Sequence, residues 1–135
     1  RIDESIDLIN NLEDKANDNN VLIYYRGIVS YLNKDYQKAI DYFDTSIKLN
    51  ANVIDCYYYK GRVFYDQENY LEAISLFEKI ISMNSYYVNA YVMVSRIHCI
   101  SENYSEAKSI LEKYYDQSNK MIKSEMLKVD AILEE

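Results

Sequence analysis

An alanine that recurs every 34 residues constrains the fold more than any other feature of the sequence. Ala39, Ala73 and Ala107 each begin a stretch with the same order of apolar and polar residues, and Ser5 holds the corresponding place one interval earlier. A constant period of this length is the mark of a repeat protein, in which each structural unit packs only on its neighbours. We therefore expect an array of stacked units.

The composition favours helices in these units. The 135 residues include no proline and only two glycines, and 49% of them are hydrophobic. Sheets need frequent turn residues between their strands, whereas helices of this spacing do not. The predicted fold class is therefore all-α.

Each unit divides into two amphipathic helices joined by a short polar turn. Apolar residues recur at helical spacing, which is typical of one buried face. The second helix of each unit follows an Asp or Asn that is expected to be its N-cap, and two of these caps have a Glu that completes a capping box. These caps are Asp35, Asn69 and Asn103. Helices are predicted at residues 2–16, 20–33, 36–49, 54–67, 70–83, 88–101, 104–117 and 120–134.

The last predicted helix departs from the repeat register. Its apolar residues still lie on one face, namely Ile122, Met126, Val129 and Leu133. The exposed end of a repeat array has to be covered, so we expect this helix to pack on the third unit. A divergent first helix of a fourth unit is the alternative.

These residues closely resemble the tetratricopeptide repeat (TPR) family, whose unit is a 34-residue helix-turn-helix. The family's small residue in the first helix of the unit corresponds to Gly27, Gly61 and Ser95. The alanine of its second helix corresponds to Ala39, Ala73 and Ala107, and the following aromatic residue to Phe43, Phe77 and Leu111. The proline that usually closes the unit is replaced by Ala51, Ser85 and Asn119, which softens the turn without changing the period.

The resemblance implies an α-solenoid of antiparallel helix pairs, wound into a right-handed superhelix. It covers residues 1–119 and predicts a single array of half a repeat, three full repeats and a C-terminal helix. The predicted segments are the second helix of a preceding repeat (1–19), the repeats 20–53, 54–87 and 88–121, and a capping helix or the start of a further repeat (122–135). Because the chain opens inside a repeat, we expect it to be a fragment of a longer protein.

The RNA-binding pentatricopeptide repeats are the family most easily confused with this one. Their unit is slightly longer, and they act as arrays that read single-stranded bases. Nucleic-acid affinity depends on Lys and Arg that neutralise phosphates. The strict 34-residue period and the net charge of −7 therefore argue against this family and against a nucleic-acid partner.

TPR proteins generally act as adaptors that bind a peptide or helix of a partner protein in a concave groove lined by the first helices of the repeats. The family's groove positions correspond here to three rows of residues. These are Val21, Tyr24, Ile28 and Tyr31; Asp55, Tyr58, Arg62 and Tyr65; and Asn89, Val92, Arg96 and Cys99. Tyrosine provides rigid amphipathic contact area, and two arginines at one repeat position could hold a carboxylate or a phosphate.

Other interpretations of these residues stay open. The tyrosines could serve only as packing between repeats, and the two arginines could pair with nearby acids such as Asp55 and Asp66. The function could instead be self-association, or docking on the parent chain, through the unpartnered apolar face of residues 1–16. A third hypothesis is an accessory region of a larger enzyme whose catalytic residues lie elsewhere.

One specialised family function is not expected. The chaperone-binding members hold two carboxylates with Lys, Asn and Arg residues at defined positions. The matching positions here are Tyr24, Ile28, Tyr59, Asn89 and Met93, and this set does not fit. An EEVD-type chaperone tail is therefore not a predicted partner.

The sequence contains few of the residues and motifs that catalytic sites use. His98 is the single histidine, and its helical position predicts a packed core residue. No glycine-rich phosphate loop or nucleophile motif is present in the sequence. We therefore predict a non-enzymatic chain with no metal site and no cofactor.

Cys56 and Cys99 have no metal-site or redox spacing and are expected to be buried free thiols. This favours the cytoplasm or another reducing compartment. No apolar run approaches the length of a membrane span, so insertion into a membrane is not expected.

Overall fold

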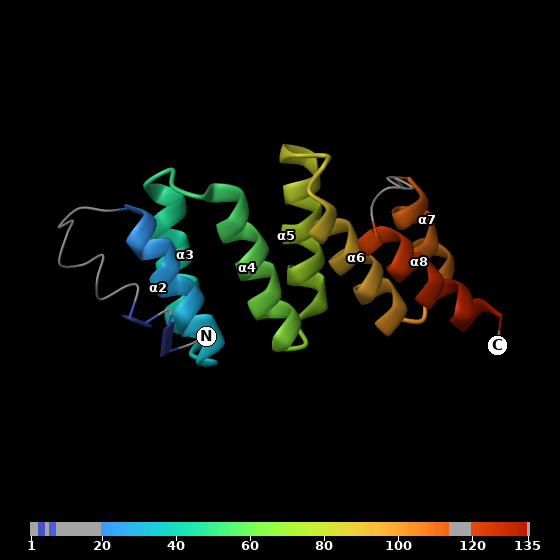
Figure 1. The fold of residues 1–135 in the computed structure, drawn as a ribbon, viewed down its shortest axis with the longest axis horizontal. Helices are drawn as coiled ribbons and strands as arrows, with labels where there is room; N and C mark the ends of the chain where they lie inside the picture. Colours follow the sequence, from blue (N-terminus) through green and yellow to red (C-terminus); the bar gives the residue numbers. More distant parts are fainter. Residues whose placement is uncertain (1–2, 5, 8–19, 114–119, 135) are drawn as a thin grey trace. The chain divides into compact units, whose positions relative to one another are not determined.

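The computed structural model describes residues 3–4, 6–7, 20–113 and 120–134. Within these residues all regular structure is helical and no strand is present, which confirms the all-α prediction. The helices are α2 (Asn20–Leu32), α3 (Tyr36–Lys48), α4 (Val53–Asp66), α5 (Tyr70–Met83), α6 (Val88–Ile100), α7 (Tyr104–Glu112) and α8 (Lys120–Leu133) (Figure 1).

The predicted helix starts agree with the structure to within one residue from α2 to α8. The ends agree equally well except in α7, which ends at Glu112 and is followed by a turn residue, Lys113. The remainder of the predicted helix 104–117 lies outside the described residues. Most of the predicted helix 2–16 also lies outside them, although residues 3–4 and 6–7 are helical.

Two of the three predicted N-caps, Asp35 and Asn103, have the right position but make no capping hydrogen bond. Asp35 precedes α3 and Asn103 precedes α7, and neither side chain bonds to a first-turn amide. The ψ angles of these two residues are 75° and 63°. They lie outside the β region in which an N-cap side chain is aimed at those amides.

Backbone hydrogen bonds, in place of side-chain caps, close the turns that precede the second helix of each repeat. Lys34, Glu68 and Glu102 each adopt a positive φ of about 60° (63°, 62° and 61°). The amide of the next residue then donates to a carbonyl in the last turn of the preceding helix, as Asp35 does to Ser30 at 2.9 Å. This is the Schellman arrangement that commonly ends helices, here without glycine.

Two compact units make up the chain, residues 1–69 and 70–135, and each is described by itself. In the first unit α3 packs against both α2 and α4. Its core is centred on side chains with no exposed surface, namely Ala39, Phe43, Cys56 and Val63.

Gly27 allows α2 and α3 to approach closely. A Cβ atom placed on Gly27 would lie 2.5 Å from Cε1 of Phe43, well inside the van der Waals limit. The ring of Phe43 is completely buried and has no space to retreat. The small residue that the TPR pattern requires at this position is therefore explained by a direct contact.

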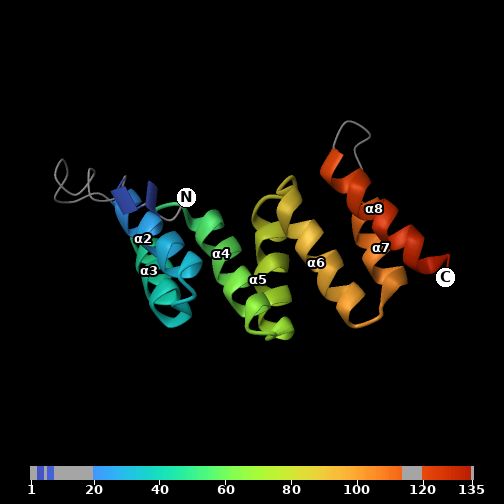
Figure 2. The same cartoon turned by 60° about the horizontal axis from the view of Figure 1, so that its bottom comes forward.

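In the second unit α8 packs on α6 and α7 (Figure 2). The core beneath it comprises Tyr91, Val92, Ala107, Leu111, Ile122 and Val129. Met126 packs against this core, whereas Leu133, at the end of α8, is 46% exposed. Three of the four apolar residues expected on the buried face therefore lie there, and the prediction for Leu133 is wrong because the last turn extends past the core.

Two further predictions of burial are wrong in part. Cys56 is fully buried, but Cys99 is partly exposed, and so is His98. Both residues lie in the last turn of α6, next to the exposed residues Ile100 and Ser101. The end of the helix leaves their side chains only partly covered.

Gly27→Ala should destabilise the protein although alanine is the better helix former. The new Cβ would overlap the ring of Phe43, and core overpacking typically costs about 1–3 kcal/mol. The higher helix propensity of alanine over glycine offsets only about 1 kcal/mol of this cost. Chemical denaturation should therefore show a lower free energy of unfolding.

A second substitution provides the control for this prediction. Phe43→Leu makes room beside residue 27, so the double variant should lose less than the sum of the two single variants. A Gly27→Ala protein as stable as the wild type would contradict the close approach of α2 and α3.

Candidate functional site

The predicted groove residues of the first unit come from two neighbouring helices, α2 and α4. We call the surface that they form the α2/α4 face. Its members are Tyr24, Ile28 and Tyr31 from α2, and Asp55, Tyr58, Arg62 and Tyr65 from α4. Contacts between side chains of the two helices, described below, hold this face together.

An aromatic cluster lies under the face, with Tyr59 at its centre. The ring of Tyr59 is stacked on Phe43 at 5.9 Å between centroids, with an interplanar angle of 19°. Edge contacts join it to Tyr24 at 6.2 Å, to Tyr31 at 5.9 Å and to Tyr58 at 5.4 Å. Such ring pairs stabilise by about 0.5–1.5 kcal/mol each beyond their burial. Tyr59 thus connects α2, α3 and α4.

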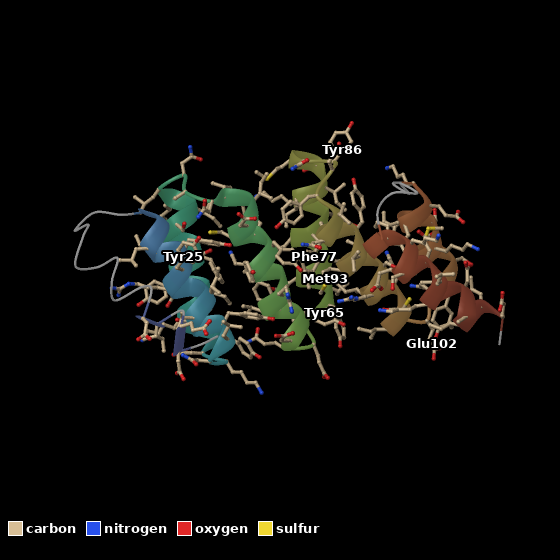
Figure 3. The ribbon with its side chains drawn as sticks, viewed as in Figure 1. Tyr25, Tyr65, Phe77, Tyr86, Met93 and Glu102 are labelled. Atoms are coloured by element: carbon tan, nitrogen blue, oxygen red, sulfur yellow. The ribbon has the colours of Figure 1, made fainter. Side chains whose placement is uncertain are left out.

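The tyrosines of the face are largely covered. Tyr24 and Tyr31 are each 8% exposed and Tyr58 is 9% exposed. Their rings therefore contribute mainly to packing and leave little area for a partner. The partly exposed members of the face are Ile28, Asp55, Arg62 and Tyr65, the last of which projects from α4 (Figure 3).

Arg62 lies between two of these tyrosines. Its guanidinium carbon is 5.6 Å from the ring centroid of Tyr31 and 5.9 Å from that of Tyr58. Both distances are within the range of cation–π attraction. Burial works to lower the pKa of Arg62, but the neighbouring Tyr31 and Tyr58 outweigh burial and the pKa is raised. The group is therefore a permanent cation.

One nitrogen of this cation has no hydrogen-bond acceptor. The Nε atom of Arg62 is buried and without a partner. None of the ion pairs formed among the described residues includes Arg62. The acid suggested as its partner, Asp66, instead accepts a hydrogen bond of 2.8 Å from the hydroxyl of Tyr31.

The bond between Tyr31 and Asp66 links α2 to the end of α4. Burial, and then this hydrogen bond, raise the pKa of the Tyr31 phenol well above its usual value. The phenol is therefore neutral and a donor in any physiological solution. The bond holds the ring of Tyr31 in place beside Arg62.

The corresponding arginine of the second unit is already paired. Arg96 donates from Nη2 to Oε1 of Glu125 at 2.8 Å, and its Nε lies 3.5 Å from Oε2 of the same carboxylate. Glu125 belongs to α8, is 6% exposed and also receives a 3.1 Å bond from Lys128. Burial works to raise the pKa of Glu125, but the bonds from Arg96 and Lys128 outweigh it and the pKa is lowered.

The other groove positions predicted in the second unit differ in how exposed their side chains are. Val92 is only 3% exposed because it packs in one cluster with Ile122 and Val129 of α8. Asn89 and Cys99 are partly exposed. The side chain of Val21 lies outside those that the structure describes.

The roles of three residues of the site are not evident from the sequence. In the sequence Tyr59 stands out only as a poor match to the chaperone-binding pattern, yet it is the centre of the aromatic cluster. The sequence presents Asp66 only as one of the acids that could pair with arginine, whereas in the structure it accepts from Tyr31. Glu125 left a readable signal, since it is an acid placed between Ile122 and Val129 on the apolar face of its helix.

No metal-binding group of three or more His, Cys, Asp or Glu side chains occurs in the part of the chain that the structure covers. Among the helices placed there, none combines the length and the apolar character that crossing a membrane requires.

Comparison with known proteins identifies the family. Residues 3–80, more than half of the chain, match the family model described as anaphase-promoting complex, cyclosome, subunit 3, which is of TPR type. The chain belongs to this tetratricopeptide repeat family. TPR proteins are typically protein–protein interaction modules and are generally non-catalytic.

Several solved structures share this fold. A crystal structure of MamA is 26% identical, with a TM-score of 0.64 over 70% of this chain, which spans only 55% of the MamA chain. The Arabidopsis OM64 TPR domain is 19% identical, with a TM-score of 0.69 over 83% of this chain and 94% of that domain.

The first TPR domain of Spaghetti (RPAP3), bound to the HSP90 peptide SRMEEVD, is 17% identical. Its TM-score is 0.71 over 86% of this chain and 96% of that one. At such identities the OM64 and Spaghetti structures show the fold alone. No curated protein matches the chain.

Tyr31→Phe should lower the free energy of unfolding. It removes the hydroxyl that donates to Asp66, and a lost hydrogen bond to a charged acceptor typically costs about 1–3 kcal/mol. Tyr36→Phe is the matched control, since the Tyr36 hydroxyl makes no hydrogen bond within the described residues. Urea denaturation should separate the two variants, and equal stabilities would show that the bond to Asp66 contributes nothing.

Glu125→Gln should weaken the packing of α8 at neutral pH, at a cost of about 1–3 kcal/mol, because it removes the charged acceptor of Arg96 and Lys128. The lowered pKa of Glu125 means that its stabilising effect is present above the usual value of 4.5 and is lost as pH falls through the folded-state pKa. The difference from wild type, measured by thermal unfolding, should therefore shrink in acid.

Glu112→Gln is the control for this experiment. Glu112 is 54% exposed and lies 3.9 Å from Lys108, an exposed pair of a kind that contributes about 0–1 kcal/mol. If both variants behave alike at every pH, the pair between the exposed Arg96 and the buried Glu125 is not what stabilises α8.

Proposed function

We propose that the chain binds a segment of a partner protein on the α2/α4 face, with Arg62 as its anchor. One observation carries this proposal. Arg62 is a charged side chain held by two tyrosine rings, with no acid of the described residues in an ion pair with it. A cation without an ion-pair partner on an interaction surface suits electrostatic complementarity with a ligand.

The partly exposed side chains of the α2/α4 face support the proposal. Ile28, Asp55, Arg62 and Tyr65 combine an apolar, an acidic, a basic and an aromatic side chain on one face. Tyrosine and arginine are enriched among the residues that contribute most to protein interfaces. The rings on either side of Arg62 also restrict its side chain in advance, which reduces the entropy lost on binding.

The second unit offers a weaker site by the same criteria. Arg96 already has a carboxylate partner, and Val92 is covered by α8. Of the three predicted rows we therefore place binding on the first two, and assign Asn89, Val92 and Arg96 a secondary role.

The expected partner is a peptide or helix of a protein. A chaperone tail of EEVD type is not expected, because Tyr24 and Ile28 stand where that clamp needs Lys and Asn. The net charge of −7 disfavours nucleic acid. The alternative of self-association through residues 1–16 concerns a segment that lies mostly outside the described residues.

A charge reversal tests the proposal. Arg62→Glu should abolish capture of the partner from a lysate of the source cells, with retained proteins identified by mass spectrometry. Loss of a hot-spot residue typically costs about 2 kcal/mol or more, which is roughly a 30-fold loss of affinity. Purified partner should show this loss in calorimetric titration.

Lys38→Glu is the matched control. It makes the same change of charge at an exposed position on α3 and should leave capture unchanged. Circular dichroism should show equal helicity for both variants.

Truncation of Tyr58 is a poorer test, since Tyr58 is 9% exposed and belongs to the aromatic cluster. Equal capture by Arg62→Glu and wild type would exclude the α2/α4 face as the binding surface.

A further inference from the structure

We infer that α8 is a conditionally docked helix, which leaves α6 and α7 as one unit when the ion pair between Arg96 and Glu125 is broken, while α6 and α7 stay folded. This movement lies within the second unit and is independent of binding at the α2/α4 face. The feature that points to it is a carboxylate at the centre of the buried face of α8, since Glu125 is only 6% exposed.

The apolar residues of α8 lie on either side of this carboxylate. Ile122 and Val129 are 1% and 2% exposed and pack in one cluster with Ala107 and Leu111 of α7. Glu125 stands between them in the sequence, three residues after Ile122 and four residues before Val129. The three side chains therefore share the face of the helix that is turned toward the core.

The first unit has an aromatic residue at the corresponding place. Cys56 and Val63 of α4 have the same spacing about Tyr59 and pack in one cluster with Phe43 of α3. The ring of Tyr59 is stacked on Phe43 at 5.9 Å. Where α4 docks with an aromatic ring, α8 therefore docks with a charge.

A carboxylate at this place makes the docking of α8 depend on a cation. Taking an ionised group out of water is costly unless an opposite charge offsets the cost, whereas a buried apolar residue needs no such partner. Burial opposes the ionisation of Glu125, but the bonds from Arg96 and Lys128 outweigh it and lower the pKa, so the group is ionised in neutral solution. The docked position of α8 is therefore stable only with these bonds in place.

One of the two cations belongs to α6 and the other to α8 itself. Arg96 of α6 donates to Glu125 at 2.8 Å, with its Nε 3.5 Å from the second oxygen. Lys128 donates at 3.1 Å, but it lies on α8 and moves with Glu125. Undocking therefore separates Glu125 from Arg96 and returns the carboxylate to water beside Lys128. A hydrated carboxylate makes the undocked state less costly than an exposed apolar residue would.

A second ion pair joins α8 to α7 closer to the surface. Lys108 and Asp130 approach to 2.6 Å, and their side chains are 35% and 36% exposed. Pairs with this exposure contribute less than buried ones, because water and salt screen them. The control of docking therefore rests with Arg96 and Glu125.

The arginine of this pair is open to the solvent. Its side chain is 46% exposed, and Arg96 holds one of the predicted groove positions. A contact that draws Arg96 away from Glu125 also weakens the docking of α8, and the coupling is reciprocal. Such a contact would uncover Val92 and Leu111, which share a buried cluster with residues of α8.

Native-state hydrogen exchange of the full chain, measured by mass spectrometry, tests this inference. A helix that opens by itself exchanges its amides faster than neighbours that open only with the whole unit. The amides of α8 should exchange about tenfold faster than those of α6 and α7, or more. Equal rates in the three helices would show that α8 opens only with the rest of the unit and would overturn the inference.

Glu125→Met should make docking independent of Arg96. Replacing one member of a buried ion pair by an apolar residue removes the need for a cation, so exchange in α8 should slow about fivefold or more. The rates of α6 and α7 should change little. Lys123→Met, on the exposed side of α8, is the matched control and should leave all rates unchanged. Unchanged or faster exchange in Glu125→Met would overturn the role of the carboxylate.

Arg96→Gln tests the pair from the other side. It leaves the buried carboxylate without its partner on α6, so exchange in α8 should rise about tenfold or more while α6 and α7 change little. Lys108→Gln should have a smaller effect, because its pair is more exposed. An equal rise in all three helices, or a larger effect of Lys108→Gln, would overturn the inference. The wild type and Glu125→Met keep the test decisive if Arg96→Gln does not fold.

Discussion

The first unit depends on the packing of one side chain, Phe43. Its ring fills the space left by the missing side chain of Gly27 and is stacked on Tyr59 at 5.9 Å. A single residue of α3 thus sets the distance to α2 and the orientation of α4. The tyrosines beside Arg62 lie on these two helices, so the geometry of the candidate site follows from this contact. A packed interior transmits such constraints because it has little free volume.

The two arginines at the same repeat position show how one scaffold produces different surfaces. Arg96 and Arg62 are equivalent in sequence, but of the two it is Arg96 that receives a carboxylate from another helix among the described residues. There the arginine holds α8 in place. In the first unit the guanidinium lies between two tyrosine rings with its Nε unpartnered. The repeat fixes the position of the side chain, and the neighbouring segment decides what it does.

Membership in the TPR family accounts for the architecture and for a general role in protein interactions. It does not identify the partner, because folds of this kind carry many functions on surfaces that vary independently of the core. The particular chemistry of this chain comes from Arg62, from its two flanking tyrosines and from the bond between Tyr31 and Asp66. These features are local and belong to this sequence.

The sequence alone determined the helices, their starts and the residues at which helices meet. A fixed period and apolar spacing encode these features locally, as Gly27 and Ala39 illustrate. Only the tertiary structure decided that Tyr24 and Tyr31 are 8% exposed, that Tyr59 is the centre of the aromatic cluster and that Glu125 pairs with Arg96. These facts depend on contacts between residues far apart in the chain. Helical periodicity tells which side of a helix a residue occupies, but not which distant side chain covers it.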